Sequence, residues 1–260
     1  MTPLLQVNSI SFSYPGEKLL FRDLSFSLEK GSSLTILGPN GAGKTSMLNC
    51  IAGLLHPSSG SIKIAGQDIR KLPAAERARL IGYVPQLHQA VYGYSVRDFI
   101  VMGRAPYIAL FRMPSEKDYA IADQIIADMG LADIAERPYT QLSGGQQQQV
   151  LIARVLAQNP QLIIMDEPTN HLDYGHQLKA LKMIKKLTEE GYSVIFTTHT
   201  PDHALLMGGT TAILHMGGKL TVGPAGQIVS EDTLYGLYGV PLFLDYARKA
   251  RRTACVAPPI

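Results

Sequence analysis

Gly38-Pro-Asn-Gly-Ala-Gly43-Lys44-Thr45 is the stretch of sequence that decides the fold. It matches the pattern G-x-x-x-x-G-K-[ST] and lies between a β-branched segment at 33–37 and a helical pattern at 46–55, the context of a phosphate-binding loop. Its glycines let backbone N–H groups point at phosphate oxygens, and the helix N-terminus adds partial positive charge. We expect nucleotide phosphates to contact Gly38, Pro39, Asn40, Gly41, Ala42, Gly43, Lys44, Thr45 and Ser46, with Mg²⁺ on the Thr45 hydroxyl.

A second motif, Gln161-Leu-Ile-Ile-Met165-Asp166-Glu167, places two carboxylates directly after an apolar segment. Such a segment is typical of a strand buried in a parallel sheet, and parallel strands present ligands at their carboxyl ends. Asp166 is expected to hold Mg²⁺ through its water shell, because this ion keeps several waters and few carboxylates. Glu167 is expected to polarise an attacking water. The two motifs together favour a site that hydrolyses a bound nucleotide.

The pattern of segments predicts an α/β protein. Expected strands lie at 7–14, 24–28, 33–37, 61–64, 161–165 and 192–197, with a closing hairpin over 212–222. A helical segment at 175–189 separates two of the apolar strands, and this β-α-β order implies a right-handed crossover and a parallel sheet. From about 95 to 142 the spacing changes to that of helices.

We therefore expect one domain with a P-loop NTPase core, an N-terminal antiparallel β subdomain and an inserted helical subdomain. The core and the β subdomain are assigned to residues 1–94 and 155–260. The helical insert is assigned to residues 95–154.

Composition restricts the class of protein. The net charge of +3, from 24 basic and 21 acidic residues, is too small to indicate nucleic-acid binding. No apolar stretch is long enough to span a bilayer, and the N-terminus lacks the pattern of a signal peptide. Two cysteines provide no disulfide framework, which favours a reducing cytoplasm. The basic run Arg248-Lys-Ala-Arg-Arg252 is expected to be a solvated tail, with contact to anionic lipid headgroups as the alternative.

The motif Leu142-Ser143-Gly144-Gly145-Gln146 precedes a helical segment. Ser143 and the N–H groups of Gly144 and Gly145 can cap that helix and form an anion site. The loop at Lys44 already surrounds the phosphates of its own nucleotide. The second site is therefore expected to bind a phosphate of the nucleotide that a second copy of the chain holds. Two subunits arranged head to tail would complete both sites.

With these motifs in this order, the chain resembles the ABC ATPase superfamily along nearly its whole length. The resemblance implies that Tyr14 stacks on adenine and that Gln86 contacts Mg²⁺ and the attacking water. It also implies that Asp173 lies in the loop that crosses between subunits, and that His199 holds the γ-phosphate together with Glu167. Gln146 belongs to the signature, but Gln147 and Gln149 stand where the family often has basic residues.

A finer resemblance is to ATPases of metal-chelate importers. It rests on Tyr94-Ser-Val-Arg-Asp-Phe-Ile-Val-Met-Gly-Arg104, on Pro168-Thr-Asn-His-Leu-Asp173 and on Tyr238-Gly-Val240. Thr197-Thr-His-Thr-Pro-Asp-His203 is similar to the molybdate-like branch. The resemblance implies import of an iron siderophore, haem or cobalamin, with molybdate or tungstate as the alternative.

The resemblance also implies partners and a location. These are ATP, Mg²⁺, a second copy of the chain, two permease subunits and a periplasmic or extracellular substrate-binding protein, at the cytoplasmic face of the membrane. The permease is expected to dock between Gln86 and Tyr94, where His88, Tyr92 and Tyr94 lie in one short segment, with local packing against the helical insert as the alternative. A soluble ABC protein of DNA repair or ribosomes is the first rival, but the chain shows neither its coiled coil nor a tandem cassette. An exporter ATPase is the second, and the Met102-Gly-Arg104 segment disfavours it.

Overall fold

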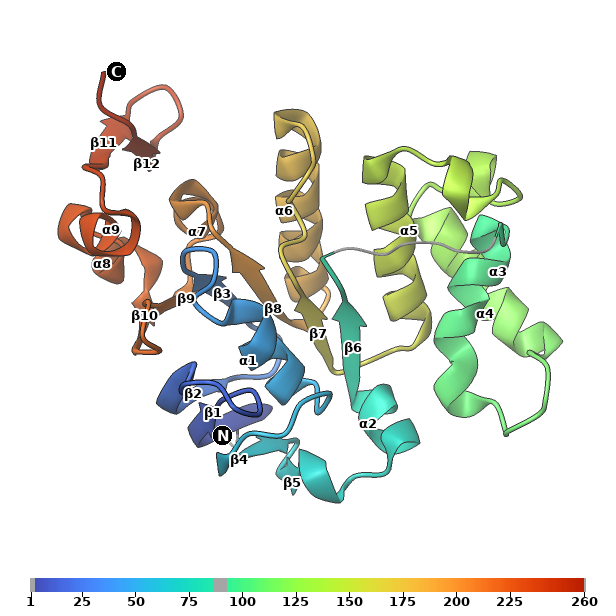
Figure 1. Ribbon diagram of the computed structural model, residues 1–260. Coiled ribbons are helices and arrows are strands. Elements are labelled where there is room, and N and C mark those ends of the chain that lie inside the picture. Colours follow the sequence, from blue (N-terminus) through green and yellow to red (C-terminus); the bar gives the residue numbers. More distant parts are fainter. Residues whose placement is uncertain (1–2, 87–92, 260) are drawn as a thin grey trace.

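The computed structural model describes residues 3–86 and 93–259. Its centre is a six-stranded sheet of order β10-β9-β3-β8-β7-β6, parallel except for β10, which pairs antiparallel with β9. Its strands are β3 (Ser33–Leu37), β6 (Ile81–Val84), β7 (Leu162–Met165), β8 (Ser193–Thr198), β9 (Thr210–Leu214) and β10 (Leu220–Pro224). The carboxyl ends of β3, β8, β7 and β6 therefore lie along one edge of the sheet (Figure 1).

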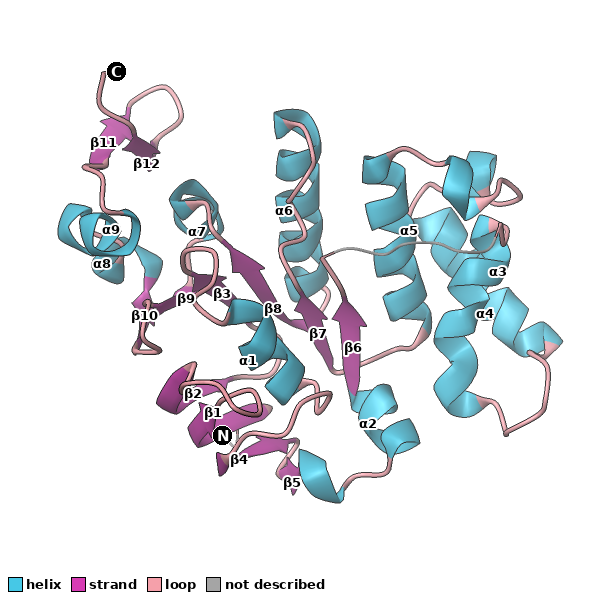
Figure 2. Ribbon diagram, viewed as in Figure 1, coloured by secondary structure: helices cyan, strands magenta, loops and turns pink. Residues whose placement is uncertain are grey.

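A second, antiparallel sheet is formed by the N-terminal part of the chain and packs beside α1 (Lys44–Ile51) (Figure 2). Its strand order is β2-β1-β4-β5, with β1 (Leu5–Phe12), β2 (Phe21–Leu28), β4 (Ser59–Ile64) and β5 (Gln67–Asp68). Exposed and buried residues alternate along β2, as expected for a strand with one face in the core. The short helices η1 (Ile69–Lys71) and α2 (Ala74–Leu80) lead from this sheet to β6.

The helical insert packs on the side of β6 away from β3 (Figure 1). It contains α3 (Val96–Val101), η2 (Met102–Tyr107), α4 (Glu116–Asp128), η3 (Ala132–Ile134), η4 (Tyr139–Gln141) and α5 (Gly144–Ala157). Two further helices, α6 (Tyr174–Glu189) and α7 (Pro201–Met207), follow β7 and β8.

Strand β7 is apolar throughout because it contributes to two separate cores. Leu162 and Ile164 belong to the core that the sheet shares with α1 and the N-terminal strands. Ile163 and Met165 belong to the core that the sheet shares with α3, α4, α5 and α6. Alternate residues of a strand point to opposite faces, so each face of β7 is buried by a different set of elements.

The C-terminal segment forms helices α8 (Ala225–Ile228) and α9 (Glu231–Tyr238) and a hairpin of β11 (Phe243–Ala247) and β12 (Arg252–Val256). Of the predicted solvated tail, Arg248, Lys249 and Arg251 are exposed. The prediction is wrong for Arg252, whose guanidinium pairs with both carboxylate oxygens of Asp202 at 2.7 Å. A charged run in sequence does not reveal an acidic partner fifty positions away.

The expected fold class is confirmed. The structure also contains strands that the sequence did not predict, among them β6 at one edge of the central sheet, and the other differences concern element ends. The helix expected from Ser46 begins at Lys44, because Gly43 adopts a left-handed conformation and ends the preceding loop. The expected insert boundary at 154 falls inside α5, which continues to Ala157. The division into subdomains therefore remains a prediction. Within the described ranges, every helix is too short or too polar to cross a bilayer.

Gly103 permits the close contact between η2 and α5, and its substitution tests the packing of the insert. A Cβ at this buried residue would clash with the carbonyl oxygen of Arg154. We expect Gly103→Ala to lower the free energy of unfolding by about 1–3 kcal/mol, as overpacking does, measured by urea denaturation. Gly236→Ala, in α9 where nothing lies within 4 Å of the added carbon, is the matched control and should be neutral or stabilising. An undiminished stability of Gly103→Ala would contradict the close contact.

Candidate functional site

The predicted phosphate loop connects β3 to α1. Gly43 has φ of 97°, which only glycine adopts without strain, and a Cβ there would approach Leu20 Cγ to 2.9 Å. This turn directs Lys44 inward, where its Nζ donates to the carbonyl oxygens of Gly38 at 2.9 Å and Pro39 at 3.1 Å. The Lys44 side chain is only 5% exposed. A buried ammonium group requires anionic or carbonyl partners, so the loop favours an anion.

A cavity of about 430 Å³ lies over this loop. It has the volume range of small-molecule sites, and many of the residues predicted for nucleotide binding line it. Tyr14 is 38% exposed at its rim, with its hydroxyl 3.0 Å from Ser46 Oγ and its ring edge-on to Phe12. The lining residues are Tyr14, Leu20, Asn40, Gly41, Gly43, Lys44, Thr45, Ser46, Gln86, Glu167 and Asn170. This lining fits a nucleoside triphosphate, because it combines glycine backbone, hydroxyls, an ammonium group and an aromatic edge.

The carboxylate of Glu167 is the point on which the site converges. Its Oε1 lies 3.1 Å from Lys44 Nζ. Its Oε2 accepts hydrogen bonds from Gln86 Nε2 at 3.3 Å and Asn170 Nδ2 at 3.2 Å, and lies 3.2 Å from His199 Nδ1. Three residues predicted from separate motifs therefore contact one buried carboxylate, together with Asn170, which the motif analysis did not single out.

Thr197 holds the two acidic residues in place and was not predicted. Its hydroxyl donates to Asp166 Oδ1 at 2.7 Å and accepts from the Glu167 backbone N–H at 2.8 Å. The backbone of Glu167 has φ of 44°, a left-handed conformation that is costly for a residue with a side chain and that such contacts help to maintain. Threonine is common in β-strands, so its presence in β8 does not by itself indicate a functional residue. Only the pairing of β8 with β7 shows that Thr197 lies beside Asp166 and Glu167.

The residues predicted for Mg²⁺ lie around the same centre. Thr45 lines the cavity directly after Lys44, and Gln86 contacts Glu167, the neighbour of the buried Asp166. A threonine hydroxyl, an amide oxygen and a carboxylate are the oxygen ligands that this ion prefers. The residues present therefore fit a magnesium ion.

The predicted second anion site lies at the start of α5. Ser143 is the N-cap, accepts from the Gln146 N–H and forms a capping box with Gln146. Gly145 packs so closely on His176 that a Cβ would come within 2.6 Å of its ring. Asp173, the N-cap of α6, accepts a hydrogen bond of 2.9 Å from the His176 backbone N–H and lies 2.6 Å from His176 Nδ1. These two contacts hold the pKa of Asp173 below its usual value. The signature turn and the loop before α6 thus form one unit.

The two anion sites are apart within one chain. Among the residues that the structure describes, none of Ser143, Gly144, Gly145 and Gln146 lines the cavity over Lys44. In the order of the central sheet, β8, β7 and β6 separate β3, which leads into α1, from the insert that contains α5 (Figure 1). The loop at Lys44 and the turn at Ser143 therefore belong to different parts of the fold.

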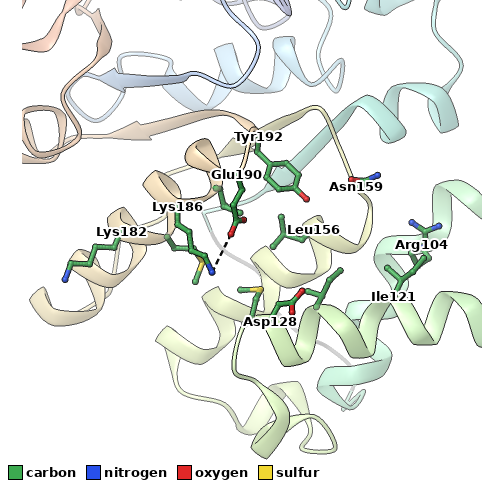
Figure 3. A pocket seen from close by; sticks show the side chains of 13 residues that line it. Arg104, Ile121, Asp128, Leu156, Asn159, Lys182, Lys186, Glu190 and Tyr192 are labelled. Atoms are coloured by element: carbon green, nitrogen blue, oxygen red, sulfur yellow. Dashed lines mark ion pairs between the residues drawn. The ribbon is translucent and has the colours of Figure 1, made fainter.

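A larger cavity, of about 820 Å³, lies elsewhere, between α4, α5 and α6 (Figure 3). Ile121 and Leu156 contribute apolar surface, and Lys186 and Glu190 form an ion pair across one α6 turn at 3.5 Å. None of the predicted site residues lines it. Volume alone therefore does not identify the functional site, whereas the converging polar groups do.

Comparisons with known proteins show the family of the chain. A family model described as ABC transporter matches residues 21–170. The molybdate import ATP-binding protein MolC of Haemophilus influenzae is 34% identical over 249 residues, 95% of this chain and 93% of that protein. A protein of Helicobacter pylori named "Probable iron chelatin transport ATP-binding protein" is 36% identical over 92% of this chain and 94% of its own. A chain from a transporter assigned to the metal-chelate type, solved in an inward-facing conformation, superposes with TM-score 0.88 at 32% identity, covering 100% of this chain and 98% of that one.

Thr197→Val tests whether this hydroxyl holds the acidic pair. The substitution keeps the shape but leaves Asp166 Oδ1 and the Glu167 N–H without this partner. We expect the free energy of unfolding to fall by about 1–3 kcal/mol, measured by urea denaturation, and ATP hydrolysis to fall with it. Thr211→Val on β9 is the control, because Thr211 Oγ1 is buried with no hydrogen-bond partner among the described residues. That variant should be at least as stable as the wild type, and equal losses in both would speak against the assignment.

Proposed function

Since the chain belongs to the ABC transporter family, we propose that it is the ATP-binding and ATP-hydrolysing subunit that energises an importer of a metal chelate. The observation that carries the proposal is the contact of Lys44, Gln86 and His199 with the buried carboxylate of Glu167. This arrangement places a phosphate-binding cation beside a candidate general base.

ATP binding changes the partners of Lys44. The triphosphate lies along the backbone N–H groups of the Gly38–Thr45 loop, and phosphate oxygens replace Glu167 as the partners of the ammonium group. Glu167 then accepts a proton from the attacking water, and His199 contacts the γ-phosphate. Thr45, Gln86 and Asp166 would hold Mg²⁺, which would supply charge neutralisation for the phosphates. The chain contributes position and charge, and no covalent intermediate is needed.

Two copies of the chain complete each nucleotide site. ATP at Lys44 of one copy meets the anion site at Ser143 of the other, so the γ-phosphate links the two. Hydrolysis removes that link and lets the pair reopen. The permease senses the change through the segment after Gln86. Residues 87–92 of the predicted docking segment, including His88 and Tyr92, lie outside the described residues; Tyr94 is described and is 46% exposed.

The cargo is inferred from similarity. One relative carries iron chelatin in its name, and the superposed transporter is assigned to the metal-chelate type. A molybdate importer ATPase matches at a similar identity, so molybdate or tungstate is the second candidate. In either case a substrate-binding protein and two permease subunits select the cargo, and this chain acts at the cytoplasmic face of the membrane.

Glu167→Gln tests the shared nucleotide site. Without the general base the γ-phosphate persists, so we expect ATP with Mg²⁺ to convert the variant to a dimer, with hydrolysis reduced by at least about a hundredfold. Size-exclusion chromatography with light scattering measures the mass, and phosphate release measures hydrolysis. The double variant Glu167→Gln, Ser143→Arg, which blocks only the opposite anion site, should remain monomeric. A monomer in both, or a dimer in both, would contradict the shared site.

Reconstitution tests the cargo. In liposomes containing this chain and its permease, we expect binding protein loaded with an iron siderophore, haem or cobalamin to stimulate ATP hydrolysis several-fold and to drive uptake of labelled cargo. Glu167→Gln should abolish uptake while leaving the complex assembled. Stimulation by molybdate or tungstate alone would replace the metal chelate as the cargo without affecting the ATPase assignment.

A further inference from the structure

The C-terminal segment contacts the backbone of the residue that carries the predicted γ-phosphate clamp. The Tyr238 hydroxyl, at the end of α9, donates a hydrogen bond of 2.8 Å to the carbonyl oxygen of His199. These residues are 39 positions apart in the chain. Sequence analysis singled out Tyr238 only as part of a family-like ending, and the hydrolysis scheme does not use it.

A second contact ties the same region together. Asp202, in the first turn of α7, accepts two hydrogen bonds of 2.7 Å from Arg252 and one of 3.3 Å from the Cys255 N–H. Helix α7 starts directly after the His199 loop and contacts β12 (Figure 1). The C-terminal hairpin therefore holds the helix that follows His199, while Tyr238 holds His199 itself.

Tyr238 is well placed to keep this hydrogen bond. It packs against the cluster formed by Leu37, Ile213 and Leu237, and Leu37 is the last residue of β3 before the phosphate loop. Burial raises the pKa of Tyr238 far above its ordinary value, so the hydroxyl remains protonated and remains a donor. The contact is thus anchored to the same strand that positions Lys44.

The loop after β8 carries His199, whose side chain must approach Glu167 at a defined position. The backbone of this loop therefore has to be held in place. The His199 side chain is 42% exposed, and its Nδ1 lies 3.2 Å from Glu167 Oε2. On the inner side, His203 fixes the neighbouring residue, with Nδ1 3.0 Å from Thr198 Oγ1, and burial lowers the pKa of His203, which favours its neutral form. Backbone displacement of about 1 Å at a site of this kind costs large factors in rate.

We propose that Tyr238 is a positioning residue for ATP hydrolysis, which fixes the His199 backbone and thereby the approach of its imidazole to Glu167 and the γ-phosphate. The Arg252–Asp202 pair supports it by holding α7. The C-terminal segment is thus part of the hydrolytic machinery of this chain. The inference rests on the proposed function, in which His199 and Glu167 act on ATP.

Tyr238→Phe tests the proposal, because it removes one hydroxyl and keeps the packing. We expect kcat for ATP hydrolysis by the full chain to fall by about three- to tenfold, the change that corresponds to one hydrogen bond. KM for ATP with Mg²⁺ should stay within about twofold, since the bond does not touch the phosphate loop. Tyr235→Phe is the matched control, because Tyr235 lies on the same helix and is 60% exposed, and it should leave kcat unchanged.

A double-variant cycle separates positioning from general structural support. In a His199→Ala background, whose residual hydrolysis is followed by release of labelled phosphate, Tyr238→Phe should cause no further loss. Arg252→Met should lower kcat in the wild-type background by a smaller factor, and should add little to Asp202→Asn.

The outcomes are distinct. An unchanged kcat for Tyr238→Phe, or an equal loss with and without His199, overturns the inference while the proposed function stands. A wild-type chain that does not hydrolyse ATP with Mg²⁺ overturns the proposed function and this inference together. If Tyr238→Phe lowers kcat at unchanged KM, and this loss is absent in the His199→Ala background, the result supports both the proposed function and this inference.

Discussion

The ion pair between Lys44 and Glu167 is the interaction on which the rest of the site depends. Both side chains are almost fully buried, and a buried charge is tolerated only with a partner of opposite charge and further hydrogen bonds. Gln86 and Asn170 supply two of these bonds. The donors come from the ends of neighbouring strands, so the order β3-β8-β7-β6 is the architectural condition for assembling them.

This pair also explains how binding and chemistry are coupled. Lys44 cannot neutralise both Glu167 and a triphosphate equally, because its ammonium group has only three donors, and two carbonyl oxygens already occupy it. In the proposed cycle, phosphate oxygens take the third direction and release the Glu167 carboxylate from the ammonium group. In that proposal, substrate binding frees the base from its ion pair, with no separate activating step.

Much of this could be predicted from sequence, and most of the failures have a common cause. The phosphate loop, the acidic pair and the parallel strands follow from local patterns, since each depends on residues adjacent in the chain. Thr197 and Tyr238 were missed because each acts across the fold on a residue far away in sequence. The solvated-tail prediction was wrong for Arg252 for the same reason. Asn170 is the exception, because it contacts Glu167 only three positions away.

In the proposed function, this chain determines when ATP is hydrolysed, and other subunits select the cargo. Every polar group that converges in the cavity over the phosphate loop is suited to phosphate, magnesium or adenine. The signature helix α5 carries an uncharged residue at a position where the family often has a basic one. That residue, Gln147, donates a hydrogen bond to the Tyr139 carbonyl within the insert. Without a charge at that position, attraction between the copies relies on the backbone N–H groups and dipole of α5, whose strength depends on a nearby anion. In the proposed dimer, closure is then governed by the γ-phosphate itself, which is the property that a transport ATPase requires.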